Sequence, residues 1–195
     1  MTYEIPDYIT HYYLADCQPF LSLSKLDPEK HQYIFNELLN RHKKKLGYHR
    51  RYGRSYLYTR KTIENTLRSH FIKRGGKPTV RYPFYFVLGE SIWFKHLNQN
   101  HSEIKIPLKE LNPATVSFTY PDSYVALSNN TKPYHGKVFL LNELKSVVDR
   151  YGFSADDTSL NYDSYWLNDF EIYIEFQVWE QEIIQPFIDL FYEEK

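Results

Sequence analysis

A glutamate close to the C-terminal end lies in a pattern that could give its carboxyl group a chemical role. Glu175 belongs to the segment Glu171–Trp179 (EIYIEFQVW), in which apolar residues alternate with polar or aromatic ones. Such alternation is typical of a β-strand with two different faces. The face opposite the apolar one carries Tyr173, Glu175, Gln177 and Trp179. Aromatic neighbours partly desolvate a carboxylate, which makes its environment tunable for catalysis. The alternative is a surface acid on a half-buried strand.

Two further segments carry side chains that could meet this carboxylate. His11 is central in the β-forming segment Ile9–Tyr13, and the segment Ser117–Tyr120 (SFTY) carries hydroxyl groups that we expect to be exposed. An imidazole, a phenol and a carboxylate on three strands could form one wall of a small-ligand pocket. In that case we expect His11, Tyr120 and Glu175 to converge within about 10 Å.

The order of these segments resembles the ADP-ribosyltransferase family, in particular its DarT-like toxin branch. The resemblance rests on an early histidine strand, a middle strand with aromatic and hydroxyl side chains, and a late strand of the form E-F-x-V. It implies NAD as a substrate, and no metal is expected. It also implies that His11 contacts the NAD ribose and that Tyr120 stacks on the nicotinamide. Glu175 would be the catalytic acid that stabilises an oxocarbenium-like transition state.

The chain departs from the pattern of this family in two places. The segment between His11 and Tyr120 is longer than usual, so residues from about 25 to 100 would be an insertion. Gln177 follows the glutamate instead of preceding it.

A strongly basic segment suggests a different partner. From Arg41 to Lys77 there are 13 Lys and Arg against one acid, a charge of +12, whereas Leu141 to Lys195 holds 13 acids against 3 Lys and Arg, a charge of −10. Cations neutralise phosphates, and the interleaved tyrosines could stack on unpaired bases. The candidate nucleic-acid contacts are Lys43, Lys44, Arg50, Arg51, Arg54 and Arg60. The alternative is that the two oppositely charged segments neutralise each other in the fold.

Several other chemistries find no support in the sequence. It has no phosphate-binding glycine loop, no GxSxG elbow and no HExxH zinc motif. The pair Pro121-Asp122 followed by Glu143-Leu144-Lys145 matches the PD…ExK signature of restriction-type nucleases. That chemistry needs the acid and the lysine on one strand face, but here they fall in the first turn of an expected helix. They would point about 200° apart, which argues against a nuclease.

Both strands and helices must position these residues. The sequence predicts strands over residues 8–13, 81–88, 103–108, 116–120, 137–140 and 171–179. It predicts helices from Pro28 to about 46, from 56 to the stop at Gly75-Gly76, and from Asn142 to 151. Residues 182–192 should form a short terminal helix or an extended tail. Because strands and helices do not alternate regularly, we expect a single α+β domain over residues 1–195. Its sheet should be largely antiparallel or mixed, with several helices packed on it and a basic helical segment or insertion at about 25–80.

Composition limits the setting in which the protein works. The chain has 195 residues, 42% of them hydrophobic, which suits one globular domain without a disulfide or metal. Cys17 is the only cysteine, which favours a reducing compartment, and neither a signal peptide nor a membrane span is evident. We therefore expect a cytoplasmic protein that does not enter a membrane.

Three functions remain open at this level. The first is an ADP-ribosyltransferase-like enzyme that uses NAD and modifies a nucleic acid or a protein. The second is a nucleic-acid-binding protein that uses the basic segment 41–77 without catalysis. The third is a protein-interaction domain with exposed aromatic residues.

Overall fold

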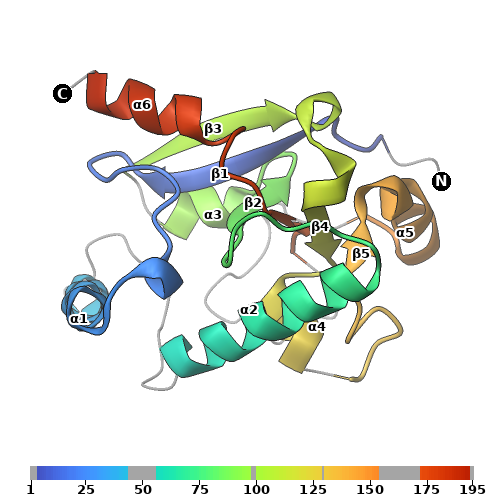
Figure 1. Ribbon diagram of the computed structural model, residues 1–195, viewed down its shortest axis with the longest axis horizontal. Coiled ribbons are helices and arrows are strands. Elements are labelled where there is room, and N and C mark those ends of the chain that lie inside the picture. The colour runs from blue at the N-terminus through green and yellow to red at the C-terminus, as the bar shows by residue number, and fades with distance from the viewer. Residues whose placement is uncertain (1–3, 44–55, 98–99, 129, 154–171, 194–195) are drawn as a thin grey trace.

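The computed structural model describes residues 4–43, 56–97, 100–128, 130–153 and 172–193, and in these residues six strands form one sheet. Every strand pair is antiparallel, in the spatial order β3-β1-β2-β6-β4-β5. Figure 1 shows this sheet with helices on both of its faces. The strands are β1 (Tyr8–Leu14), β2 (Phe84–Leu88), β3 (His101–Pro107), β4 (Val116–Thr119), β5 (Phe139–Leu140) and β6 (Glu175–Val178). The expected α+β fold with an antiparallel sheet is confirmed.

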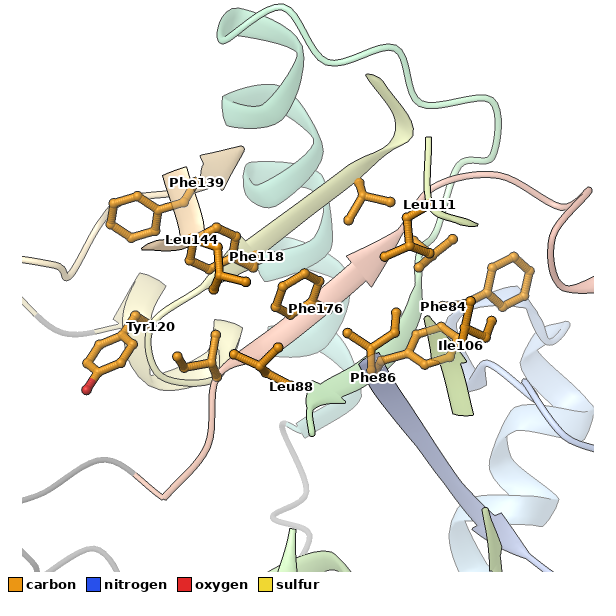
Figure 2. Packing of buried hydrophobic residues seen from close by; sticks show 14 of the residues in the cluster. Phe84, Phe86, Leu88, Ile106, Leu111, Phe118, Tyr120, Phe139, Leu144 and Phe176 are labelled. Carbon is orange, nitrogen blue, oxygen red and sulfur yellow. The ribbon is translucent and has the colours of Figure 1, made fainter. Parts of the chain in front are cut away.

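One face of the sheet, here called the apolar face, supports the main hydrophobic core. Side chains of alternate residues point to it, so that Phe86 pairs with Phe176, which in turn pairs with Phe118 across β2, β6 and β4. Phe118 and Phe176 stack with ring centroids 5.3 Å apart. Figure 2 shows these rings together with Leu88 and Ile106 in the same cluster.

Two helices close the apolar face. Helix α5 (Leu144–Tyr151) contributes Leu144, Val147 and Val148 to the core cluster, and helix α6 (Gln185–Glu193) packs on it through partly buried side chains. The helical spacing of the three apolar residues of α5 predicts this buried stripe. Gly152, with φ +88°, ends α5 in a conformation that favours glycine.

The opposite face, here called the polar face, is buried under three other helices. Helix α2 (Tyr56–Lys73) lies across it, and its Phe71 ring stacks on Trp179 of the sheet at 5.9 Å. Helix α4 (Ser123–Ser128) packs beside α2. Helix α3 (Ile92–Leu97) places Trp93 against Tyr173 at 5.6 Å. The polar face is therefore enclosed by protein and does not face solvent.

Helix α1 (Pro28–Lys43) begins as the sequence predicts. Asp27 accepts a hydrogen bond from the backbone N–H of Lys30 at 2.9 Å, which caps the first turn. The predicted end of this helix near residue 46 lies outside the described residues. Short 3₁₀ turns cover Leu23–Lys25, Leu108–Glu110, Pro113–Thr115 and Leu141–Glu143. No helix in the described part of the chain is long and apolar enough to span a membrane.

Some boundaries and two short helices differ from the sequence prediction. Strand β2 starts at Phe84, after Pro83, because proline has no N–H to donate to a neighbouring strand. Strand β6 pairs only from Glu175 onward, and Ile172 packs with Trp93 instead of with the apolar face. The hydroxyl groups of Ser117 and Thr119, expected to be exposed, are fully buried. The sequence analysis also missed α3 and α4.

The restriction-nuclease pattern is absent from the structure. Glu143 accepts the backbone N–H of Leu140 at 2.7 Å and pairs with Arg74 at 2.9 Å. Lys145 instead bonds Asp149, one turn later on α5. Both residues thus belong to a capped helix start, as the sequence analysis expected.

Candidate functional site

The carboxylate of Glu175 is buried on the polar face with one oxygen held in place. The residue is 7% exposed, and its Oε1 accepts hydrogen bonds from the Ser123 backbone N–H at 3.1 Å and from Gln177 Nε2 at 3.2 Å. Its other oxygen, Oε2, forms no hydrogen bond with any described residue. Glu175 is therefore a buried carboxylate with one oxygen held in place by two donors.

Gln177 orients this carboxylate through a chain of buried partners. Its Oε1 accepts from the Ser117 hydroxyl at 2.9 Å, which itself accepts from the Trp179 indole N–H at 2.9 Å. Its Nε2 lies 3.1 Å from the Thr119 hydroxyl. The strand register explains this arrangement, because Gln177 pairs with Ser117 and Glu175 pairs with Thr119 on the same face. The amide is thus fixed in the orientation that points its N–H groups at Glu175.

A second buried carboxylate lies on α2, over the same face of the sheet. Glu64 is 2% exposed, and its Oε1 accepts from Arg60 Nε at 3.2 Å and from the Tyr85 hydroxyl at 3.1 Å. The guanidinium of Arg60 stands over the Tyr85 ring at 3.9 Å. Tyr85 in turn pairs with Gln177 in the sheet. Arg60, Glu64 and Tyr85 therefore form one unit beside the Glu175 network.

Tyr85 stays a neutral hydrogen-bond donor between the two carboxylates. Burial raises its pKa well above the ordinary value, and although the positive charge of Arg60 acts in the opposite direction, the negative charges of Glu64 and Glu175 raise it further. Tyr85 links the two carboxylates, because its hydroxyl donates to Glu64 and its backbone pairs with Gln177, the neighbour of Glu175 on the polar face.

Three buried polar atoms of this site have no hydrogen-bond partner among the described residues. They are Glu64 Oε2, Arg68 Nε and Ser123 Oγ. Most buried polar groups in proteins are hydrogen-bonded, so unpaired ones require an explanation. These three come from α2 and α4, the neighbouring helices that cover Glu175. Of the three residues, Ser123 contacts Glu175 directly through its backbone N–H, whereas Glu64 and Arg68 lie four residues apart on one face of α2.

The structure does not bring His11 and Tyr120 to Glu175. His11 lies two residues after Ile9, and Tyr120 lies two residues after Phe118, so each shares the face of that apolar residue. Both therefore lie on the apolar face, whereas Glu175 lies on the polar face. The prediction that the three side chains converge is therefore wrong. The physical reason is the alternation of a strand, which sends neighbouring residues to opposite faces.

Both residues have structural contacts of their own. The two ring nitrogens of His11 bond the Tyr85 carbonyl at 2.8 Å and the Phe20 N–H at 3.0 Å, and burial lowers the pKa of His11 to about 4. Tyr120 is 3% exposed, donates its hydroxyl to the Gly152 carbonyl at 3.2 Å and lies at one end of the apolar cluster in Figure 2. Neither ring has an open face toward the carboxylate site.

The candidate nucleic-acid residues are only partly placed. Lys44, Arg50, Arg51 and Arg54 lie outside the described residues, and Lys43 is the last residue of α1. Arg60 is 12% exposed and belongs to the buried unit with Glu64, so its charge faces the carboxylate site.

A concave surface lies where the C-terminal end of α2 meets β5 and α5. This basic groove has a volume of about 620 Å³. It is lined by His70 and by the charged side chains of Lys73, Arg74, Lys137, Glu143 and Arg150. Arg74 is anchored there, because it donates to the Val138 carbonyl at 2.7 Å and pairs with Glu143.

Sequence reasoning missed Glu64, Arg68 and Tyr85 as members of the site. The spacing of Arg60, Glu64 and Arg68 by four residues could have revealed a polar stripe beside the apolar stripe of the same helix. Alternation along 84–88 could have placed Tyr85 opposite the phenylalanines. No sequence signal joins these residues to Glu175, because the contact depends on how α2 packs on the sheet.

Comparison with known proteins gives no family for the chain. No family model matches it, and no curated protein or solved structure is detectably similar to it.

Proposed function

We propose that the protein is an enzyme that transfers ADP-ribose from NAD, with Glu175 as its catalytic carboxylate. One observation carries the proposal: the carboxylate is buried, with Oε1 held by two donors and Oε2 without a hydrogen bond to any described residue. A carboxylate held in this way costs no reorganisation when positive charge develops next to it.

The reaction suits this arrangement. When the bond between ribose C1′ and the nicotinamide nitrogen breaks, the electron pair leaves with the nicotinamide and positive charge develops on the ribose. A negative Oε2 in a site of low polarity stabilises that charge much more strongly than it would in water. The acceptor then forms a bond to C1′ and gives up its proton, which passes to Glu175 and on to solvent.

The polar face also offers groups that could hold the rest of NAD. Arg68 has an unpaired Nε and forms no ion pair with a described residue, so its guanidinium is available to a pyrophosphate. The Ser123 hydroxyl is likewise available to a ribose hydroxyl. We assign to Ser123 the ribose contact that the family resemblance implies for His11, and to Arg68 a pyrophosphate contact that the resemblance does not specify.

Replacement of Glu175 by glutamine tests the proposal. A glutamine can still accept the bonds from Ser123 and Gln177 through its oxygen, so the variant should fold and melt within about 2 °C of the wild type. It lacks the negative charge at Oε2, so nicotinamide release from NAD should fall at least roughly a hundredfold. The measurement is nicotinamide production by chromatography, beside a thermal melt.

A matched control is Glu110→Gln, which removes a carboxylate from an exposed 3₁₀ turn. This variant should release nicotinamide at the wild-type rate. Full activity of Glu175→Gln would remove the proposal, as would a wild-type protein that neither binds nor cleaves NAD.

A second candidate function is nucleic-acid binding without catalysis, and the positive charge of the basic groove favours it. It predicts no nicotinamide release by any variant. A cytoplasmic place of action, where NAD and nucleic acid are both present, is part of the proposal for either function.

A further inference from the structure

The basic groove collects cations from three separate segments of the chain. Lys73 is the last residue of α2 and Arg74 follows it, Lys137 precedes β5, and Arg150 lies on α5. Segments far apart in the sequence thus supply charge to a single concave surface. Clustered charge of one sign in a groove raises the local concentration of an oppositely charged partner.

Most of these cations form no ion pair with the residues that the structure describes. Arg74 is paired with Glu143, the one acidic residue that lines the groove. Lys73, Lys137 and Arg150 form no ion pair with any described residue. Their three positive charges are therefore exposed to a partner. Among the described residues of the groove, only the pair Arg74–Glu143 supports the alternative that the basic and acidic segments neutralise each other.

The arrangement fits phosphate groups along a chain better than a single small anion. The three unpaired cations stand on different walls, and the one guanidinium that is fixed in orientation, that of Arg74, is already bound to Glu143 and the Val138 carbonyl. A built site for one phosphate would instead direct several fixed donors at one point. Dispersed lysine and arginine charges are typical of contacts to a nucleic-acid backbone.

We infer that the basic groove binds the sugar–phosphate backbone of a nucleic acid. The binding stands on the groove alone and does not depend on the proposed catalysis. Helix α2 connects the two sites, because it supplies Arg60, Glu64 and Arg68 to the carboxylate site and its last turn to the groove.

The test compares binding of labelled single-stranded RNA, single-stranded DNA and duplex DNA by fluorescence anisotropy over a range of salt concentrations. The variant carries Lys73→Gln, Lys137→Gln and Arg150→Gln together. If each cation neutralises one phosphate, the slope of log affinity against log salt should become shallower by roughly 2 for a single strand. Affinity at low salt should fall more than tenfold.

The matched control replaces three exposed cations that do not line the groove, Lys30, Arg81 and Lys109, by glutamine. It has the same net charge as the groove variant and should bind almost as the wild type does. Circular dichroism of both variants checks that they are folded.

The outcomes separate this inference from the proposed function. Loss of binding in the groove variant but not in the control supports the groove. Equal binding by all three proteins, no binding of any nucleic acid, or binding only of a mononucleotide, inorganic phosphate or a polyglutamate peptide overturns it. Glu175→Gln should still bind nucleic acid, because Glu175 does not line the groove. If nucleic acid binds but NAD is not cleaved, the catalytic proposal fails and the groove stands.

Discussion

Gln177 shows how one neutral side chain can hold a buried carboxylate in place. Its amide is fixed by Ser117 and Thr119, and it donates to the carboxylate of Glu175 two positions earlier on the same strand face. A buried carboxylate without such donors would be strongly penalised. The sequence order of acid and amide, which departs from the family pattern, thus has a clear structural role.

At the same scale, His11 should make the protein sensitive to acid. Burial lowers its pKa from 6.5 to about 4 in the folded state. Between these values the unfolded chain binds a proton that the folded chain does not, so the free energy of unfolding falls as the pH falls from about 6.5 to about 4. The loss from this residue should reach about 3 kcal/mol at the lower limit.

Urea unfolding of the wild type and of His11→Phe at several pH values between these limits measures the effect. The variant should be less stable at neutral pH, since it loses the bonds to Tyr85 and Phe20, but its stability should depend less on pH by about one proton. Parallel pH profiles for the two proteins would contradict the lowered pKa.

Sequence alone identified part of the candidate site. Strand alternation placed Glu175 and Gln177 on one face, and the structure keeps them there. The same rule, applied to His11 and Tyr120, assigns a face relative to their own strands but not relative to β6. Only the register between strands fixes that relation, and register depends on pairing over long stretches of sequence.

At the scale of elements, α2 depends on how its end is closed. Gly75 has φ +92°, and the Gly76 N–H donates to the Phe71 carbonyl at 3.0 Å, so the chain turns sharply after the helix. The turn brings Gly76 against the ring of Phe71, which stacks on Trp179. This contact fixes the helix on the polar face and so fixes the position of Glu64 and Arg68.

Gly76→Ala should therefore loosen α2. The added methyl carbon would lie 2.5 Å or less from three carbons of the Phe71 ring, and that ring is fully buried and cannot move away. We expect a loss of about 1–3 kcal/mol in unfolding free energy, measured by urea denaturation.

Its control is the double variant Gly76→Ala with Phe71→Leu, in which the smaller side chain leaves room for the methyl group. The loss of unfolding free energy in the double variant should then be smaller than the sum of the losses in the two single variants. Strict additivity would show that the clash with Phe71 is not the cause.

The long elements were predictable because their periodic patterns are strong, but the short ones were not. Ile63, Leu67 and Phe71 recur every four residues, a spacing that predicts α2, and all three residues are buried. Helices α3 and α4 are six residues each, too short for a periodic pattern. Their start signals were nevertheless present, since Asp122 accepts the N–H groups of Tyr124 and Val125.

For the whole molecule, a sheet built from both ends of the chain implies cooperative folding. Strand β1 comes from the N-terminal part and β6 from the C-terminal part, and β2 pairs with both of them. Neither half of the chain can complete the sheet alone. This topology agrees with the prediction of a single domain over residues 1–195.

Denaturant unfolding should accordingly be a single transition. Far-UV circular dichroism reports helices and strands, whereas fluorescence reports tryptophans that include the buried Trp93 and Trp179. The two midpoints should coincide within error for one domain. Separate midpoints would show that the basic helical part unfolds independently of the sheet.

Helix α2 also sets a distance between the carboxylate site and the basic groove, because it contributes residues to both. From Glu64 to Lys73 it advances nine residues, which at about 1.5 Å per residue is roughly 13 Å along its axis. On the proposed roles, a phosphate bound at Lys73 would lie about four nucleotides of a duplex strand from the carboxylate site, measured along this axis. The rigid helix would then keep the two bound ligands at one constant separation.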